Sequence, residues 1–400
     1  MSSEDAPTRS DRHGASGHGA VTERIPYGHQ SVDDDDIRAV AEIMRGEYLT
    51  TGPAIAAFES GLRTATGAAH AVAVSSGTAA LHAMYFGAGI SAGDEIVTSP
   101  MTFAATANAA LYLGATVRFA DVDPATGNID PSHVEALIGE RTRAVVAIDY
   151  TGQPADYDAL REITGHRGIA LLADAAHSLG ASYHGRSVGT LADASALSFH
   201  PVKPITTGEG GAVITDDPGL AARAARFRTH GVTRDPEEME RDDGPWFYEQ
   251  HDLGFNYRLT DLQAALGCSQ LRHLDAFIAR RREIARRYTV AFADLDEITT
   301  PHLTNGVEPG WHLYVVLVRD AARRRACFEH LHKLGLGVQV HYIPVYLHPY
   351  YRSLGFRPGL CPAAEDRYAR SVSLPIFPRL GDSAVDDVIA RVRRAVRDVL

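Results

Sequence analysis

The chain has 400 residues, 45% of them hydrophobic, and a formal net charge of -11 at pH 7, so it can bury the cores of one large and one smaller domain. The negative charge argues against nucleic-acid and anionic-membrane partners, because their phosphates attract positive fields. Three widely separated cysteines without metal-ligand spacing, no apolar run of membrane-spanning length and no secretory signal lead us to expect a cytoplasmic protein without a metal site or a disulfide framework.

The first two thirds of the chain predict a large α/β domain. Residues 1–22 are small and polar with no apolar period, and we expect a disordered leader there. Carboxylates at residues 33–36 precede the amphipathic run IRAVAEIM, which predicts a helix that ends at Gly46. From about residue 70 to 215, short β-type runs alternate with Ala-rich helical stretches. This alternation predicts, over residues 23–265, a mainly parallel sheet covered by helices on both faces.

The last third predicts a connecting helix and a small α/β domain. Residues 260–290 keep large apolar side chains at helical spacing with arginines opposite, which predicts one long helix. Its part over residues 266–290 would connect the two domains. WHLYVVLV and GVQVHYIPV are expected as strands, with one helix around CFEHLHKLG and a closing helix from Asp382. Residues 291–400 would then form the small C-terminal domain.

Lysine is nearly absent from the chain: Lys203 and Lys333 stand against 37 arginines. A guanidinium cannot be deprotonated in a protein and cannot form an imine, so chemistry that needs a neutral amine must keep lysine. Lys203 lies in SFHPVKPITTGEGG after an expected strand, where Pro204 forbids a helix. A surface-loop lysine is the ordinary interpretation, but the scarcity of lysine favours an imine-forming amine. Lys333, near a helix end, suits the helix dipole instead.

Other residues match the needs of a pyridoxal phosphate (PLP) site around such a lysine. An acid must keep the pyridine nitrogen protonated, and Asp174 ends the apolar strand GIALLAD, although it could instead cap the following turn. Gly77 and Thr78 open a helix after the strand AVAVSS, where backbone N–H groups bind phosphate. Ser198 shares the strand-to-loop edge of the lysine. Phe103 is available to stack on a ring or to fill the core.

Six segments, in order and spacing, resemble the DegT/DnrJ/StrS-type family of PLP-dependent sugar aminotransferases: SSGTAAL, PMTFAATANAA, ADAAHSLGA, SFHPVKPITTGEGG, DLGFNYRLTDLQAALGCSQL and HYIPVYLHPYY. The likeness runs from about Ile25 to the C-terminus. The lysine segment and HYIPVYLHPYY most resemble the branch of pseudaminic-acid synthesis, the UDP-4-amino-4,6-dideoxy-N-acetyl-β-L-altrosamine transaminases. The resemblance implies the type I fold of PLP-dependent transferases, which is aspartate-aminotransferase-like.

The resemblance also implies roles for single residues. Lys203 would be the Schiff-base lysine, Asp174 the pyridinium partner and His177 a neighbour of the ring hydroxyl, where the family often has Gln. Phe103 would stack on the ring. The other implied ligands are Gly77, Thr78 and Ser198 for the phosphate, Asn256 for the phosphate of a partner subunit in a homodimer, and Arg258, His341 and Tyr342 for the sugar nucleotide. Arg258 could instead simply start the long helix, and His341 could be a hydrogen-bonded strand histidine.

The implied reaction moves an amino group from L-glutamate to the C4 keto group of a UDP-linked 2-acetamido-2,6-dideoxy-hexos-4-ulose. Lys203 would carry the proton in both half-reactions, and its presence separates the chain from relatives that have His there and act as dehydratases. One alternative is an aminotransferase of a dTDP-3-keto or dTDP-4-keto deoxysugar or of a cyclitol ketone. The others are a PLP enzyme that does not transaminate and a non-catalytic regulatory protein on the same scaffold.

Overall fold

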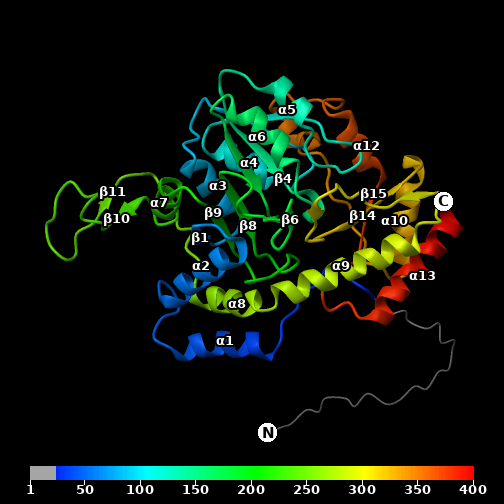
Figure 1. Ribbon diagram of the computed structural model, residues 1–400, viewed down its shortest axis with the longest axis horizontal. Helices are drawn as coiled ribbons and strands as arrows, with labels where there is room; N and C mark the ends of the chain where they lie inside the picture. The colour runs from blue at the N-terminus through cyan, green and yellow to red at the C-terminus, as the bar shows by residue number, and fades with distance from the viewer. Residues whose placement is uncertain (1–23) are drawn as a thin grey trace, which may run out of the picture.

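A seven-stranded sheet forms the centre of the part of the chain that the computed structural model describes, residues 24–400 (Figure 1). The strand order is β1-β9-β8-β5-β4-β2-β3. The strands are β1 (His70–Val74), β2 (Glu95–Thr98), β3 (Thr116–Phe119), β4 (Thr142–Ile148), β5 (Ala170–Asp174), β8 (Ala194–Ser198) and β9 (Gly211–Thr215). Only β9 runs antiparallel to its neighbours, so the sheet is mainly parallel, as predicted. The expected leader at residues 1–22 lies outside the described residues.

Helices cover both faces of this sheet, because successive side chains of a buried strand point to opposite sides. Val72 and Val74 of β1 face one core and Ala73 faces the other. The first core is closed by α3 (Gly77–Gly87), α4 (Ala105–Tyr112) and α7 (Pro218–Phe227). The second is closed by α2 (Pro53–Thr66), α5 (Pro131–Leu137), α6 (Tyr157–Gly165) and α8 (Asp261–Leu271).

The predicted single helix over residues 260–290 is two helices, α8 and α9 (Leu274–Ala291), so that prediction was wrong. At the junction the N–H groups of Arg272 and His273 bond three residues back, to Ser269 and Gln270, which interrupts the α-helical ladder. The apolar period continues through the break and therefore does not reveal it. Figure 1 shows α9 following α8 below the large sheet and running toward the C-terminal helix α13.

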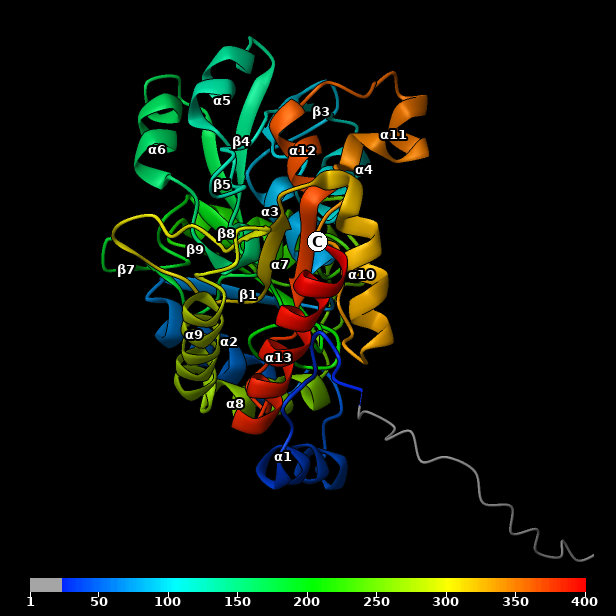
Figure 2. The same cartoon turned by 90° about the vertical axis from the view of Figure 1, so that its right-hand side faces the viewer.

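The C-terminal part is a three-stranded sheet in the order β12-β14-β15 with helices packed against it. Its elements are β12 (Ile298–Thr299), β14 (Tyr314–Val318), β15 (Ser371–Leu374), α10 (Arg324–Lys333) and α13 (Asp382–Val399). The core beneath the sheet also takes Ile284 and Tyr288 from α9. Both α9 and α10 pack beside α13 (Figures 1 and 2).

The predicted strand GVQVHYIPV is also wrong. Only single bridges form there, between Ile25 and Leu336 and between Gln339 and Ser373. Beyond Gln339 the chain leaves β15 and crosses to the large domain, where Val345 N donates to the carbonyl of Pro100 at 3.0 Å. The segment alternates like a strand because it lies half-buried between the two domains, not because it is paired along its length.

The remaining elements lie at the periphery. They are α1 (Asp34–Arg45), β6 (Ser182–Tyr183), β7 (Arg186–Ser187), β10 (Val232–Thr233), β11 (Glu249–Gln250), β13 (Val307–Glu308), α11 (Pro349–Ser353), α12 (Pro362–Arg370) and the short 3-10 turns Tyr150–Gly152, Ala321–Arg323 and Val345–Leu347. The β10–β11 hairpin projects from the body (Figure 1). Within residues 24–400 no helix is long and apolar enough to cross a membrane.

Candidate functional site

Lys203 lies on the irregular connection between β8 and β9, as its neighbouring prolines predict. Its backbone N–H donates to the carbonyl of His200 at 2.9 Å, and Thr207 N donates back to Phe199 at 3.0 Å, so the loop is closed on itself. Burial lowers the pKa of the Lys203 amine to about 8, from 10.5 for an ordinary lysine, and the charge of Asp174 opposes this shift. The amine is therefore partly neutral and nucleophilic near neutral pH.

Asp174 ends β5 and is only 8% exposed. Its Oδ2 accepts from Thr106 Oγ1 at 2.6 Å, and its Oδ1 accepts from Ala176 N at 3.2 Å. Thr102 Oγ1 lies 2.8 Å from Thr106 Oγ1. Burial raises the pKa of the Asp174 carboxyl, while the Thr106 hydrogen bond and the charge of Lys203 lower it. The carboxylate thus caps the following turn, the alternative left open above, and also interacts with the lysine.

His177 follows in that turn and lies among aromatic side chains. Its Nε2 is 3.0 Å from the hydroxyl of Tyr342, and its ring centroid is 4.4 Å from that of His312. The Nδ1 atoms of both histidines are buried without a partner in the described chain. Burial lowers the pKa of each imidazole well below its ordinary range, with the nearby Lys203 charge acting in the same direction. Both rings are therefore neutral at pH 7.

The start of α3 forms a cradle beside Ser198. The helix begins at Gly77, and Ser76 caps it by accepting from Ala79 N at 3.1 Å. A Cβ on Gly77 would lie 2.8 Å from Ser198 Cβ, so only glycine allows this approach. Thr78 occupies the next helical position and is half-buried. Unpaired N–H groups and a hydroxyl at a helix start suit an anion such as phosphate.

Arg258 and Asn256 are placed by their backbones. Arg258 forms an antiparallel bridge with Val74 at the end of β1, three residues before Gly77. Asn256 is exposed and forms a bridge with Thr229. Neither side chain makes a hydrogen bond or an ion pair within residues 24–400. Arg258 thus lies just before α8. Its backbone also pairs with the end of β1, next to the start of α3 that forms the cradle.

His341 is a hydrogen-bonded histidine, but it does not lie in a strand. Its Nδ1 is 2.8 Å from Ser373 Oγ, and its carbonyl accepts from the hydroxyl of Tyr150 at 2.5 Å. Burial lowers the pKa of His341 to about 4, and the charge of Lys203 adds to the effect. The imidazole is neutral at pH 7, so it can donate or accept a hydrogen bond but cannot supply positive charge to a diphosphate.

A cavity of about 610 Å³ is lined by Thr102 and by Tyr342, whose hydroxyl lies 3.0 Å from His177 Nε2. Phe103 is 66% exposed at its wall, which excludes a place in the core. The other aromatic residues of its lining are Tyr112, Tyr342, Tyr350 and Tyr351. Tyr346, in the same segment, is instead fully buried and donates to Glu365 at 2.6 Å. The lining of the cavity is therefore aromatic and mainly apolar.

Sequence reasoning missed several residues that support this site. Thr102 precedes α4 and Thr106 lies in its first turn, and their place in PMTFAAT directly after a strand was the available signal. Asp149 accepts from Ser178 Oγ at 2.5 Å and from Tyr157 OH at 2.8 Å, which anchors the turn next to His177. Burial raises the pKa of Asp149 to about 6, although these hydrogen bonds oppose the shift. No sequence signal distinguishes this aspartate from others that end strands.

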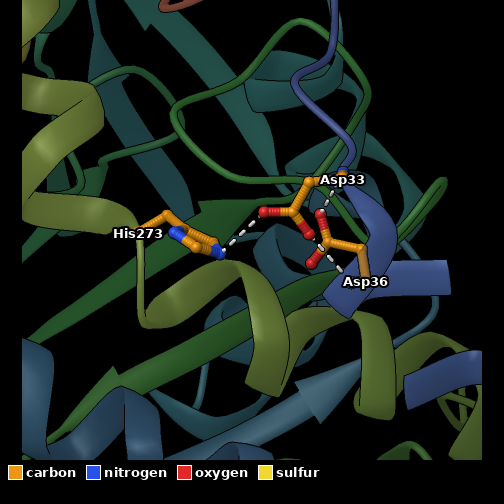
Figure 3. Close-up of side chains that lie close together, drawn as sticks. All are labelled: Asp33, Asp36 and His273. Atoms are coloured by element: carbon orange, nitrogen blue, oxygen red, sulfur yellow. Dashed lines mark hydrogen bonds and ion pairs between the residues drawn. The ribbon is translucent and has the colours of Figure 1, made fainter. Parts of the chain in front are cut away.

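Asp33, Asp36 and His273 form the one group of potential metal ligands in the described part of the chain, with their ligand atoms within 4.8 Å of one another (Figure 3). The two aspartates form a reciprocal capping box at the start of α1, and Asp36 also accepts from Gln270 at 2.5 Å. His273 lies 3.3 Å from Asp33. These contacts fasten α1 to the α8–α9 junction and account for the group as helix packing.

Comparisons with known proteins agree with this architecture. A model of the DegT/DnrJ/EryC1/StrS aminotransferase family matches residues 30–393. The spore coat polysaccharide biosynthesis protein SpsC of Bacillus subtilis (strain 168) is 39% identical over 378 residues, which are 93% of this chain and 97% of that protein. The UDP-4-amino-4,6-dideoxy-N-acetyl-beta-L-altrosamine transaminase of Campylobacter jejuni subsp. jejuni serotype O:23/36 (strain 81-176) is 38% identical over 336 residues, 82% of this chain and 86% of that one.

A solved structure shows the same likeness in three dimensions. Helicobacter pylori PseC, an aminotransferase involved in the biosynthesis of pseudoaminic acid, superposes with a TM-score of 0.88 at 34% identity, over 94% of this chain and 100% of that one. The fold expected from the sequence, the type I fold of PLP-dependent transferases, is confirmed.

Proposed function

The chain belongs to the DegT/DnrJ/EryC1/StrS family of PLP-dependent sugar aminotransferases, and we propose that it moves an amino group from L-glutamate to C4 of a UDP-linked 2-acetamido-2,6-dideoxy-hexos-4-ulose. The observation that carries the proposal is Lys203, an amine of lowered pKa on a closed loop beside a buried carboxylate. The choice of sugar rests on the likeness to the Campylobacter transaminase and to PseC.

The residues of the site fit PLP. The amine of Lys203 would hold the aldehyde carbon, and Asp174 would face the pyridine nitrogen. The glycine-dependent cradle of Gly77 and Ser198, with Thr78 behind it, would take the phosphate dianion. The remaining ligands would be His177 at the ring hydroxyl and Phe103 on the ring face. When bound, PLP supplies a ring that withdraws electrons from the substrate carbon.

Each residue then has a definite chemical task. Lys203, with its pKa near 8, can accept the Cα proton of the donor and return it within the site, as a general base and acid must. Asp174 would present its negative charge to the pyridine nitrogen and favour its protonated form. His177 is kept neutral by burial, so it replaces the Gln of many relatives without adding a charge. Tyr342 fixes the His177 ring through the 3.0 Å hydrogen bond.

We further propose a homodimer with shared sites. Asn256 is exposed and its side chain has no partner within the described chain, so it is available to a phosphate of the second subunit. Leu253 and Phe255, which precede it in the chain, are 83% and 40% exposed. Apolar side chains grouped this way on a surface favour a protein contact over solvent.

The sugar nucleotide would lie in the aromatic cavity. Tyr342 and Tyr350 offer amphipathic surface to a sugar ring or a uracil, whereas Tyr351 is only 2% exposed and supports the wall from behind. Arg258 is the positive group available to the diphosphate, since His341 is neutral at pH 7. We therefore propose that Arg258 pairs with the negative charge of the diphosphate and that His341 contributes only a hydrogen bond.

The test is a panel of keto-sugar nucleotides presented with glutamate to the PLP-loaded enzyme, with identification of each product. We expect the UDP-linked acetamido sugar to give the highest kcat/KM. One missing methylene in an apolar pocket is worth ~1–3 kcal/mol, so a dTDP-4-keto-6-deoxyhexose, which lacks the whole acetamido group, should react at least about 10-fold less efficiently. If that sugar is used equally well or better, the substrate assignment fails and the family assignment stands.

A further inference from the structure

Arg281 of α9 is a buried cation without a buried anion beside it. Its side chain is 1% exposed, and burial lowers the pKa of the guanidinium to about 10 with no carboxylate contributing. Nη1 donates to the carbonyls of Ile376 at 3.0 Å, Trp311 at 3.2 Å and His312 at 3.4 Å. Nη2 donates to the carbonyl of Val202 at 3.4 Å. Four backbone carbonyls therefore take the place of a counter-ion.

These carbonyls come from three segments that surround the lysine. Val202 immediately precedes Lys203 in the large domain. The carbonyl of His312 belongs to the residue whose ring packs on His177 at 4.4 Å. Ile376 follows β15 of the small sheet. Burying a charge without a counter-ion costs free energy that an apolar side chain would not cost, so packing alone gives no reason for arginine at this position.

We propose that Arg281 is a positioning residue that holds the Lys203 loop in register with His177 and the small domain. The planar guanidinium fork reaches several carbonyls at fixed angles, which a lysine ammonium on a flexible stem does not do. Arg281 acts through the carbonyl of Val202 and does not touch the reacting atoms. The inference rests on the proposed function, because it takes Lys203 as the reactive amine.

Arg282 provides a matched control. It is the next residue of the same helix and also donates to carbonyls, those of Pro309 at 3.1 Å and Gly180 at 3.3 Å. It also pairs with Glu308 at 3.2 Å. None of these contacts involves the lysine loop. Arg282→Gln therefore removes a comparable set of helix-to-loop hydrogen bonds without freeing Val202.

The experiment compares Arg281→Lys, Arg281→Gln and Arg282→Gln with the wild type. Three quantities are measured: the pH titration of the absorbance of lysine-bound PLP, kcat and KM for glutamate, and amide hydrogen exchange over residues 199–207 of the cofactor-free chain. For both Arg281 variants we expect a displaced titration midpoint, faster exchange in the loop and a kcat about 10- to 100-fold lower, the effect of misplacing a reacting group. KM should change by less than about threefold, since glutamate binding is not altered. Arg282→Gln should match the wild type in all three.

Arg281→Lys retains the charge and the methylene stem, so it tests the proposal even if Arg281→Gln does not fold. Wild-type titration, exchange and kcat in folded Arg281→Lys would overturn the positioning role. Failure of the proposed function has a different signature, because the wild-type chain would then itself take up no PLP or transfer no amino group.

Discussion

Replacing Thr106 with valine removes the shortest hydrogen bond to the Asp174 carboxylate without changing the shape of the side chain. The bond is 2.6 Å long and joins two buried groups. A hydrogen bond to a charged group contributes ~1.5–3 kcal/mol, which corresponds to about a 10- to 150-fold change in an equilibrium constant. Because only the ionised carboxylate pairs with a protonated ring nitrogen, we expect PLP affinity to fall by up to this factor in Thr106→Val, with the full factor reached where the Asp174 carboxyl of the cofactor-free variant is protonated. The pKa of Asp174 should rise further, so the loss should grow as the pH is lowered.

Thr102 determines how large the loss of PLP affinity is within the range of about 10- to 150-fold. Its hydroxyl lies 2.8 Å from Thr106 Oγ1 and can turn toward the carboxylate when the Thr106 hydroxyl is gone. The loss of PLP affinity should therefore lie near the lower end of the range in Thr106→Val. It should lie near the upper end in the double variant Thr102→Val/Thr106→Val. Equilibrium binding of PLP to the cofactor-free variants measures both, with Thr106→Ser as the control that keeps the hydroxyl. Wild-type affinity in the double variant would refute the role given to these threonines and to the ionised Asp174.

Three further predictions concern the lysine and the subunit contact. Lys203→Arg should fold, because the charge is kept, and should lose both half-reactions, because the imine-forming amine is lost. In the wild type, borohydride reduction should attach PLP covalently to Lys203. Labelling of Lys333 instead would contradict the assignment. The rate of covalent PLP attachment to the cofactor-free chain should rise with pH around a midpoint near 8, because only the neutral amine reacts. That midpoint should move lower in Asp174→Asn, which removes the negative charge that raises the pKa of the amine, and an unchanged or higher midpoint would be inconsistent with the geometry. Mixing inactive Lys203→Ala and Asn256→Ala chains should restore part of the activity, and mixed dimers that stay inactive would exclude shared sites.

The large domain was predictable because each signal was local. Six of the seven strands between residues 70 and 215 are largely buried on both faces, and only the edge strand β3 alternates between exposed and buried residues, a pattern that predicts a parallel sheet covered on both sides. Pro204 kept the lysine out of a helix, and Gly77 allowed the approach to Ser198. The scarcity of lysine then indicated which loop to propose for the chemistry, without any knowledge of its neighbours.

The two elements predicted wrongly, the strand GVQVHYIPV and the single helix over residues 260–290, depend on contacts that are distant in the sequence. GVQVHYIPV alternates as a strand does, but its alternation reflects two domains on its two sides, and its hydrogen bonds go to Ser373 and Pro100 instead of a continuous partner strand. The break between α8 and α9 is likewise set by where α9 must pack, not by a helix-breaking residue. His341 was expected near the sugar nucleotide from its sequence segment alone, and that segment does not show that burial leaves the imidazole neutral. Each of these properties depends on residues distant in the sequence.

Arg281 and Lys203 together explain why a chain that uses arginine almost everywhere keeps a lysine at this position. Both are cations desolvated at the same domain boundary, and burial lowers the pKa of each, to about 10 for Arg281 and about 8 for Lys203. At pH 7 roughly one lysine in ten is then neutral, whereas the guanidinium stays protonated. The same environment therefore yields a permanent donor of hydrogen bonds at one position and a nucleophile at the other. Arginine could fill the first position and never the second, because desolvation can release a proton from an ammonium near neutral pH but not from a guanidinium.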